Sequence, residues 1–377
     1  MVTCLVAGGC SSGRPPVFEV GATLEQKLET TRQHLDLPGV VVTVVRGDEL
    51  LVDRAFGVAD LETGEALTRE HAFRVASLAK PVVATLVLLL VDEGIFRLDD
   101  PISAWLPDVP NGDNITIRML LQHTSGLRNY IALPEVKAAF ASEPTRSWTE
   151  AELLEFAFEA GPHFEPPGDG WMYSNTNYVL LGQLIETLEG RPLDDVLQSR
   201  ICTPLGLENT FYSIDASIPE PFAKGYQMGD ESGPIFWAGK GSIHYDVTDA
   251  SPSMWHAAGA MVSTLDDTRT LIEAITSGAL LSEELFHEQT TWRDSGYPVD
   301  YSYGLGLVNY DGTIGHSGNE PGYQVTALTE PDLDLTVVVL TNLYSSFNYE
   351  DPANAMFFVI MKHLTGDSYA PPGWGGW

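Results

Sequence analysis

Residues 74–94 read RVASLAKPVVATLVLLLVDEG, and one lysine in this stretch needs an explanation. Nearly all residues from Val82 to Val91 are apolar, which is typical of a helix buried in a protein core. Lys80 stands at the start of this run, three residues after Ser77. An ammonium group is costly to remove from water unless a neighbouring group uses it. Lys80 is therefore expected to have a chemical role.

Ser77, three residues before Lys80, is the residue that can contact the lysine side chain. Residues i and i+3 of a helix share a face, so the hydroxyl and the amine can come within hydrogen-bond reach. A serine at a helix N-terminus also feels the positive end of the helix dipole, which favours a developing alkoxide. Lys80 could accept the serine proton if its pKa is lowered, or hold negative charge if it stays protonated. Alone the pair is weak evidence, because a surface serine followed by a lysine also occurs by chance.

Two later stretches favour a catalytic interpretation. The first is Tyr173-Ser174-Asn175, directly before an apolar-periodic helix. A tyrosine near a cationic lysine ionises more easily and can exchange protons, and the Asn175 amide can hold both the lysine and a substrate carbonyl. The second is His316-Ser317-Gly318, on a predicted strand. Gly318 would let a substrate backbone approach closely and pair with the strand edge.

The strand and helix patterns predict an α+β fold. Residues 39–60 predict two strands around a turn at 46–48, and residues 301–342 predict consecutive antiparallel strands with short turns, one of them at 319–322. An amphipathic helix is expected at 23–36, and a last helix that packs on the sheet is expected at 352–364.

The two groups of strands need each other to form a sheet of useful width. Residues 21–75 and 249–366 are therefore predicted to form an α/β subdomain with one antiparallel sheet. Residues 76–248 are predicted to form a mostly helical subdomain, with the active site between the two parts. Residues 1–20 are interpreted as an export-signal remnant and tether, and residues 367–377 as a tail.

The three motifs together resemble those of the penicillin-recognising serine hydrolases, which include class C β-lactamases, secreted D-alanyl-D-alanine carboxypeptidases and related esterases. Ser77-Leu78-Ala79-Lys80 is similar to their first motif and Tyr173-Ser174-Asn175 to their second. His316-Ser317-Gly318 resembles the third, which is Lys-Thr-Gly in many members and His-Thr-Gly in some carboxypeptidases. Order, spacing and flanks agree over residues 21–364, most clearly with the secreted carboxypeptidases. The resemblance implies a β-lactamase/transpeptidase-like fold, with an antiparallel sheet flanked by helices and a mostly helical insertion.

The resemblance also implies the catalytic roles. Ser77 would be the nucleophile that becomes acylated, and Lys80 and Tyr173 would share the proton transfers. Asn175 would orient both the substrate and the lysine. His316 would stand where many relatives place a lysine; a neutral histidine attracts anions less strongly but can relay protons.

Substrate binding would fall to the strand of the third motif. Ser317, Gly318 and Asn319 would line the substrate, and the backbone N–H groups of Ser77 and Asn319 would form the oxyanion hole. Each such preorganised donor typically stabilises the transition state by about 3 kcal/mol. No metal or other cofactor is expected, because the chain has no His-Glu-x-x-His, paired-cysteine or phosphate-loop motif.

One position departs from the carboxypeptidase pattern. Relatives that bind a free substrate carboxylate carry an arginine directly after the YGLGL segment, where this chain has Val308. Valine cannot make the bidentate contact of a guanidinium with a carboxylate. Asn319 likewise stands where a hydroxyl residue often helps to hold that carboxylate. These changes favour esters, amides or other D-amino-acid peptides over strict D-Ala-D-Ala substrates.

The predicted activity is hydrolysis through an acyl-enzyme, most simply by a penicillin-binding, D-Ala-D-Ala carboxypeptidase-like peptidase. A carboxylesterase or a β-lactamase of the same family is the alternative, and a non-catalytic penicillin-binding-like receptor or scaffold is an alternative of another class. The expected partner is a small peptide, ester or β-lactam substrate. The stretch LLQHTSGL resembles a structural loop of this family, so His123 is assigned to that loop and not to catalysis. Ser125 is not assigned as a nucleophile, because it lacks the Gly-x-Ser-x-Gly context.

The charge balance limits the macromolecular partners. The chain has 52 acidic and 20 basic residues and a formal net charge of -32, which should repel nucleic acid and anionic membranes. An acid-rich, lysine-poor surface suits a high-salt habitat, where salt screens self-repulsion, although an ordinary acidic enzyme is the alternative. The sequence leaves the oligomeric state open.

The N-terminal segment MVTCLVAGGCSSGRPP suggests export. Residues 7–10, Ala-Gly-Gly-Cys, resemble a lipoprotein cleavage site, which implies an extracytoplasmic protein that is secreted or held at the cell surface by a lipid on Cys10. No basic residue precedes the apolar part, and Ala7 stands where leucine is usual, so a disordered start of a cytoplasmic protein is the alternative. No apolar run approaches the ~20 residues of a membrane span.

Overall fold

The structure is a computed structural model, and it describes residues 18–237, 241–296, 301–345 and 351–366. The expected cleavage site at Cys10, most of the predicted tether and the tail at 367–377 lie outside the described residues. Among the described helices, none is long and apolar enough to cross a bilayer.

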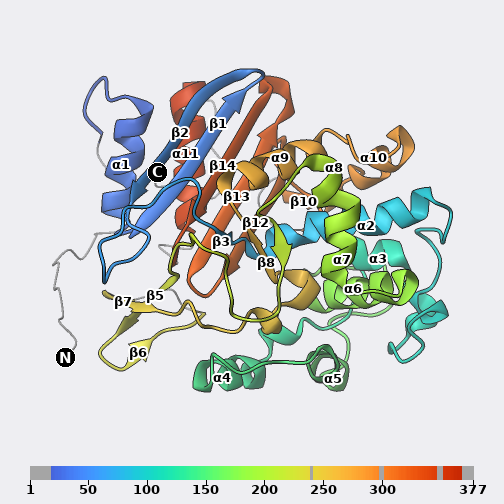
Figure 1. Cartoon of the computed structure of the whole chain (residues 1–377). Helices are drawn as coiled ribbons and strands as arrows, with labels where there is room; N and C mark the ends of the chain where they lie inside the picture. Colours follow the sequence, from blue (N-terminus) through green and yellow to red (C-terminus); the bar gives the residue numbers. More distant parts are fainter. Residues whose placement is uncertain (1–17, 238–240, 297–300, 346–350, 367–377) are drawn as a thin grey trace.

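One antiparallel sheet forms the centre of the molecule (Figure 1). Its eight described strands follow the order β2-β1-β14-β13-β12-β11-β10-β9, so the N-terminal hairpin pairs with the C-terminal strands through β1 and β14. This confirms the predicted α+β fold with an antiparallel sheet. The strands are β1 (Gly39–Arg46), β2 (Glu49–Gly57), β9 (Arg293–Asp294), β10 (Tyr301–Tyr303), β11 (Val308–Tyr310), β12 (Thr313–Glu320), β13 (Tyr323–Glu330) and β14 (Leu335–Thr341).

The side chains of β1 and β14 alternate between two hydrophobic cores, as expected for strands buried on both faces. Val42 and Val339, which face each other in the register, pack into the core formed with α1 and α11. Val41 and Leu340 point the other way, into the core shared with α2 and α9. The central strands are therefore rigid supports for the residues that follow them.

Helices cover both faces of this sheet. In Figure 1, α1 and α11 lie on one side, and the helices of the larger helical part lie on the other. The helices are α1 (Leu24–His34), α2 (Ala79–Asp92), α3 (Ile117–Leu121), α4 (Pro134–Ser142), α5 (Glu150–Glu159), α6 (Asn175–Glu189), α7 (Leu193–Leu197), α8 (Thr203–Leu205), α9 (Leu265–Thr276), α10 (Glu283–Gln289) and α11 (Pro352–Thr365).

Two small sheets join the helical part to the central sheet. In the first, β8 lies between β3 and β4; in the second, β5 pairs with β6, β7 and β15. The predicted helical insertion thus also contains the strands β4 to β7, and β15 pairs parallel with β5 across the predicted subdomain boundary. These strands are β3 (Phe73–Arg74), β4 (Phe211–Tyr212), β5 (Tyr226–Asp230), β6 (Gly233–Pro234), β7 (Ile243–Asp246), β8 (Met261–Ser263) and β15 (Leu343–Tyr344).

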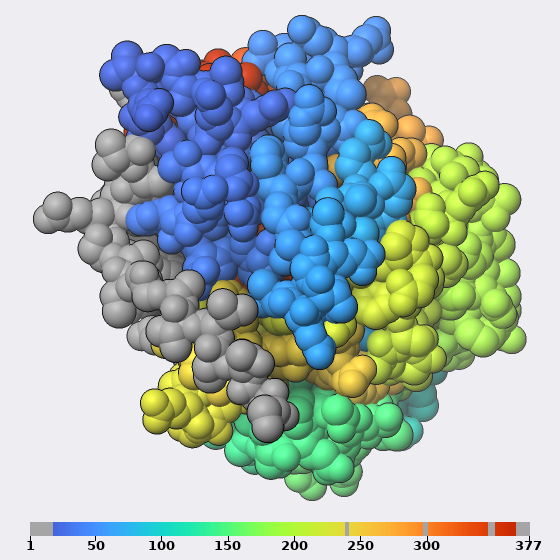
Figure 2. Space-filling model, turned by 60° about the vertical axis from the view of Figure 1, so that its left-hand side comes forward, coloured from blue at the N-terminus to red at the C-terminus, as the bar shows by residue number. Residues whose placement is uncertain are grey.

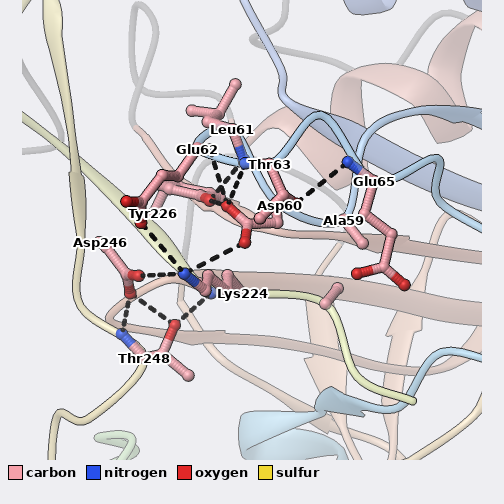
Figure 3. A network of polar contacts seen from close by, with 12 residues as sticks. Ala59, Asp60, Leu61, Glu62, Thr63, Glu65, Lys224, Tyr226, Asp246 and Thr248 are labelled. Carbon is pink, nitrogen blue, oxygen red and sulfur yellow. Dashed lines mark hydrogen bonds and ion pairs between the residues drawn. The ribbon is translucent and has the colours of Figure 1, made fainter. Parts of the chain in front are cut away.

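A polar cluster holds β5 against the loop after β2 (Figure 3). The Lys224 ammonium lies 3.2 Å from Asp60 Oδ2 and 3.4 Å from Asp246 Oδ2, and the Lys224 backbone N–H donates to the Ala59 carbonyl. Figure 2 shows the resulting neighbourhood, with the yellow segment around β5–β7 against the lower edge of the blue N-terminal layer. The start of β5 is therefore tied to the rest of the protein.

The predicted turn at residues 319–322 is shorter than expected. β12 continues to Glu320 and β13 begins at Tyr323, so only Pro321 and Gly322 form the turn. Asn319 and Glu320 pair across the ladder with residues 324 and 323, and these backbone contacts extend the strand. Because consecutive strand residues face opposite ways, the two side chains point to different faces of β12.

The two hydrophobic cores predict that shortening a leucine side chain destabilises the protein more at a buried position than at an exposed one. Leu340→Ala should lower the free energy of unfolding by ~2–5 kcal/mol, because the buried side chain leaves a cavity. Leu50→Ala removes the same atoms from a side chain that is 57% exposed, and should change the free energy of unfolding by less than ~0.5 kcal/mol. Urea unfolding measures both; equal losses would contradict the assignment of Leu340 to the core.

Candidate active site

A pocket of about 290 Å³ brings all three sequence motifs together. Seven of the eight predicted site residues line this pocket, and the eighth, Lys80, lies directly behind Ser77. The lining residues are Ser77, Asn129, Ile131, Tyr173, Asn175, Gln227, Trp237, Trp255, Tyr301, His316, Ser317, Gly318, Asn319, Glu320, Pro321 and Tyr344.

Ser77 sits at a tight junction between β3 and α2. It lies in a short 3-10 helix, Ala76–Leu78, whose first residue has a left-handed φ of 47°. Strand β12 passes very close to it: a Cβ on Gly318 would lie 2.6 Å from the Val75 carbonyl oxygen and 2.9 Å from the Ser77 backbone nitrogen. Any side chain at position 318 would push the strand away from Ser77. Gly318 therefore keeps β12 beside the Ser77 N–H group.

Lys80 is fully buried in the first turn of α2. Its Nζ lies 2.9 Å from Ser77 Oγ and donates to the Ala258 carbonyl at 2.7 Å. The rings of Tyr173 and Tyr178 flank it, with centroids 4.8 Å and 5.6 Å from Nζ. Burial lowers the pKa of Lys80 well below the ordinary 10.5. The lysine is thus favoured as a neutral amine, which can accept the Ser77 proton.

Tyr173 has the opposite shift. Burial raises the pKa of its phenol well above 10.0, and a hydrogen bond with the Ser77 side chain only partly offsets this. Burial therefore favours a neutral lysine and a neutral tyrosine, rather than the ammonium-assisted ionisation of Tyr173 expected from the sequence. In this arrangement Lys80 is suited to act as the base and Tyr173 to supply a proton.

His316 uses both of its ring nitrogens within the protein. Nδ1 contacts the Ser317 carbonyl, and Nε2 lies 3.0 Å from the Tyr303 hydroxyl. Because a carbonyl oxygen can only accept, Nδ1 carries the hydrogen and Nε2 accepts from Tyr303. Burial and the nearby Lys80 lower the pKa of His316 to about 3. His316 is therefore neutral and forms part of the wall, where both of its ring nitrogens are hydrogen-bonded within the protein.

Asn175 begins helix α6, directly after Tyr173 and Ser174. Its backbone N–H donates to the Asn129 side-chain oxygen at 3.2 Å, which fixes the start of the helix beside the pocket. Its own Oδ1 is buried and has no hydrogen-bond partner within the part of the chain that the structure describes. An acceptor in this position is available to a substrate N–H group.

The sequence assigns His123 to a structural loop, and the structure places that loop against Tyr173. The Met172 N–H donates to the His123 carbonyl at 3.0 Å, and the Ser174 N–H donates to His123 Nδ1 at 3.2 Å. These hydrogen bonds fix the backbone on either side of Tyr173. The ring centroid of Tyr173 lies 4.4 Å from that of His123. The signal for this role was present in LLQHTSGL, but the sequence does not show which loop packs on Tyr173.

Val308 follows the YGLGL segment at the start of β11, as predicted. Among the described residues that line the pocket there is no arginine or lysine. A substrate carboxylate would therefore have no cation to bind on the described pocket wall, in agreement with the interpretation of Val308.

The motifs and the fold are matched by known proteins. The profile of the Beta-lactamase family matches residues 24–357. The chain belongs to the beta-lactamase family. Within this family of serine hydrolases, penicillin-binding protein 4* of Bacillus subtilis is 28% identical over 366 residues, which cover 93% of this chain and 77% of that protein. The predicted resemblance to the penicillin-recognising hydrolases is thus confirmed.

Two solved structures have the same fold as this beta-lactamase family member. A D-stereospecific amidohydrolase from Streptomyces sp. is 30% identical, with a TM-score of 0.76 over 91% of this chain and 98% of the other. A D-amino acid amidase from Ochrobactrum anthropi SV3 is 28% identical, with a TM-score of 0.77 over 91% of this chain and 99% of the other.

The opposite pKa shifts of Lys80 and Tyr173 predict a broad pH optimum. Hydrolysis of an uncharged ester should rise with pH as Lys80 loses its proton, well below the ordinary lysine pKa of 10.5. It should then stay constant to at least the ordinary tyrosine pKa of 10.0, because Tyr173 keeps its proton there. A kcat/KM profile that still climbs through pH 10 would contradict the neutral lysine.

The contacts of His123 predict a loss of rate without loss of binding. His123→Leu removes the acceptor for the Ser174 N–H, and should lower kcat by ~10- to 100-fold with little change in KM, because Tyr173 is no longer held in place. His123→Asn should recover most of this rate, since Asn offers an oxygen near the Nδ1 position and tolerates the left-handed φ of 61°.

A purely structural role for His123 would lower the melting temperature of both variants and leave their kcat values similar. Thermal unfolding measured beside the kinetics separates the two cases.

Proposed function

We propose that this protein is a hydrolase that acylates Ser77 and cleaves amide or peptide bonds of D-amino-acid derivatives. The contact of Ser77 Oγ with the buried Lys80 amine, at 2.9 Å beside the pocket, carries the proposal. Two solved relatives that cover nearly the whole chain are named for D-stereospecific amide hydrolysis, which supports this substrate class.

The acylation step follows from these groups. Lys80 takes the Ser77 proton while Oγ attacks the substrate carbonyl, and the backbone N–H groups of Ser77 and Asn319 stabilise the oxyanion. Tyr173 gives its proton to the leaving nitrogen as the C–N bond breaks, and the Lys80 ammonium returns a proton to Tyr173. Water then attacks the carbonyl of the Ser77 ester while Lys80 takes its proton and the same N–H groups stabilise the oxyanion. The ester bond breaks, Ser77 Oγ recovers a proton, and the acid is released.

D-Ala-D-Ala carboxypeptidase activity is the narrower form of this proposal. It is weakened by Val308 and by the lack of a cation on the described pocket wall, since the substrate of a carboxypeptidase carries a free carboxylate. Simple esters fit the same acylation chemistry and need no arginine at this position, whereas penicillins and cephalosporins carry a carboxylate of their own.

Ser77→Ala should abolish turnover of every substrate and labelling by a fluorescent penicillin. The substrates to compare are a D-amino-acid amide, a D-Ala-D-Ala peptide, a short-chain aryl ester and a chromogenic cephalosporin. Retention of turnover by Ser77→Ala would contradict the proposal. Penicillin labelling without turnover of any substrate would instead favour the non-catalytic receptor.

A further inference from the structure

The carbonyl that binds Lys80 belongs to a segment of short 3-10 turns, residues 252–260, which directly precedes β8. A neutral lysine amine has two hydrogens and one lone pair. One hydrogen of Lys80 is donated to the Ala258 carbonyl at 2.7 Å, and Ser77 Oγ lies 2.9 Å from the same nitrogen. The position of the Ala258 carbonyl therefore decides whether the lone pair points to the Ser77 hydroxyl, as proton transfer requires.

The backbone of the 252–260 segment takes an unfavourable conformation at His256. The φ angle there is 40°, in the left-handed region that residues with a Cβ avoid. Such a conformation persists only where the surrounding contacts hold it. The His256 carbonyl accepts from the N–H groups of Gly259 and Ala260, at 3.0 Å and 2.8 Å, so this residue sets the path of the chain around Ala258. Contacts that fix His256 therefore fix the Ala258 carbonyl.

The ring of His256 contacts the start of α5 through both of its nitrogens. Nε2 lies 3.0 Å from the Trp148 carbonyl, and Nδ1 lies 3.4 Å from Glu150 Oε1. The other oxygen of Glu150 accepts from Gln183 Nε2 at 2.9 Å. His256 is buried, so water does not compete strongly for these contacts. The histidine thus connects the 252–260 segment to α5 and, through Glu150, to α6.

The contact between Glu150 and His256 needs a proton. A carbonyl oxygen can only accept, so the Trp148 contact places a hydrogen on His256 Nε2. In a neutral ring Nδ1 is then an acceptor, and it faces a carboxylate oxygen that also accepts unless it is protonated. Burial raises the pKa of Glu150 to about 7 and lowers the pKa of His256. Both shifts favour a neutral carboxyl group that donates to Nδ1.

We propose that Glu150 and His256 are positioning residues for Lys80. The proton between them holds the 252–260 segment so that the Ala258 carbonyl turns the lysine amine toward Ser77. This rests on the proposed function, since it needs Lys80 to act as the base. Neither Glu150 nor His256 is among the described residues that line the pocket, so the pair acts through the segment and not on the substrate.

Glu150→Leu tests this contact in the hydrolysis of a short-chain aryl ester. The substitution removes the hydrogen-bonding group, and it should lower kcat by ~10- to 100-fold with little change in KM, because the Lys80 lone pair is no longer directed at Ser77. Glu150→Gln should restore most of the rate. Its amide nitrogen can donate to Nδ1 while its oxygen still accepts from Gln183. Wild-type kcat in Glu150→Leu, or equal losses in both variants, would overturn the inference.

His256→Gly tests the same contact from the other side, and serves if Glu150→Leu does not fold. Glycine adopts the left-handed φ without strain but has no ring to contact Glu150. The kcat should therefore fall as in Glu150→Leu. A His256→Gly variant with wild-type kcat would mean that the backbone turn alone positions Ala258, and would also overturn the inference.

Leu28→Ala is the matched control for a loss of stability. Leu28 is fully buried in the core formed with α1 and α11, so its truncation should lower the melting temperature and leave kcat as in wild type. If kcat instead falls in step with the melting temperature across all four variants, the pair has only a structural role and the inference is contradicted.

The NMR signal of Lys80, in protein labelled with ¹³C at the lysine Cε, gives a readout that does not depend on turnover. At a fixed pH its chemical shift should change in Glu150→Leu and return toward the wild-type value in Glu150→Gln, because the amine loses and then regains the Ala258 carbonyl. Wild-type turnover together with an unchanged Lys80 signal in Glu150→Leu would contradict only the inference. Absence of turnover and of acylation with every substrate would contradict the proposed function as well.

Discussion

The burial of Lys80 is the constraint on which the site depends. An ammonium in this position would lose its water and, among the residues that the structure describes, gain only the Ala258 carbonyl, Ser77 Oγ and two tyrosine rings. The low dielectric therefore favours the amine, and the amine is what serine needs to become a nucleophile. The packing of α2 in the core buries Lys80 and also fixes Ser77, which lies just before the helix, so one packing arrangement sets both the geometry and the protonation.

Strand β12 and the loop that carries His123 position further groups beside Ser77 and Lys80. Gly318 allows β12 to run against the Ser77 N–H, where a side chain of any size would separate them. His123 holds the backbone on either side of Tyr173 and keeps the phenol near Lys80. In the central sheet β12 pairs with β13, which pairs with β14, so β12 cannot shift without disturbing its neighbours. Precision at the site thus derives from contacts between segments far apart in the chain.

The sequence predicted the sheet, the three motifs and their meeting in one pocket, because local patterns and motif order carry that information. Burial and side-chain orientation are not local, so the directions of the Lys80 and Tyr173 shifts and the tautomer of His316 required the structure. The same holds for Asn319: its identity is visible in the sequence, but the hydrogen bond of its Nδ2 to Asp351 is not. Val308 could be interpreted from the sequence alone, because a valine cannot bind a carboxylate in any orientation of its side chain.

The protonation state of Lys80 can be measured directly by NMR on protein labelled with ¹³C at the lysine Cε, because the chain has only six lysines: Lys27, Lys80, Lys137, Lys224, Lys240 and Lys362. Comparison with Lys80→Met assigns the Lys80 signal, and its chemical shift is then followed against pH. The account predicts a Lys80 signal that titrates well below 10.5. A Lys80 signal that titrates at 10.5 or above would contradict it.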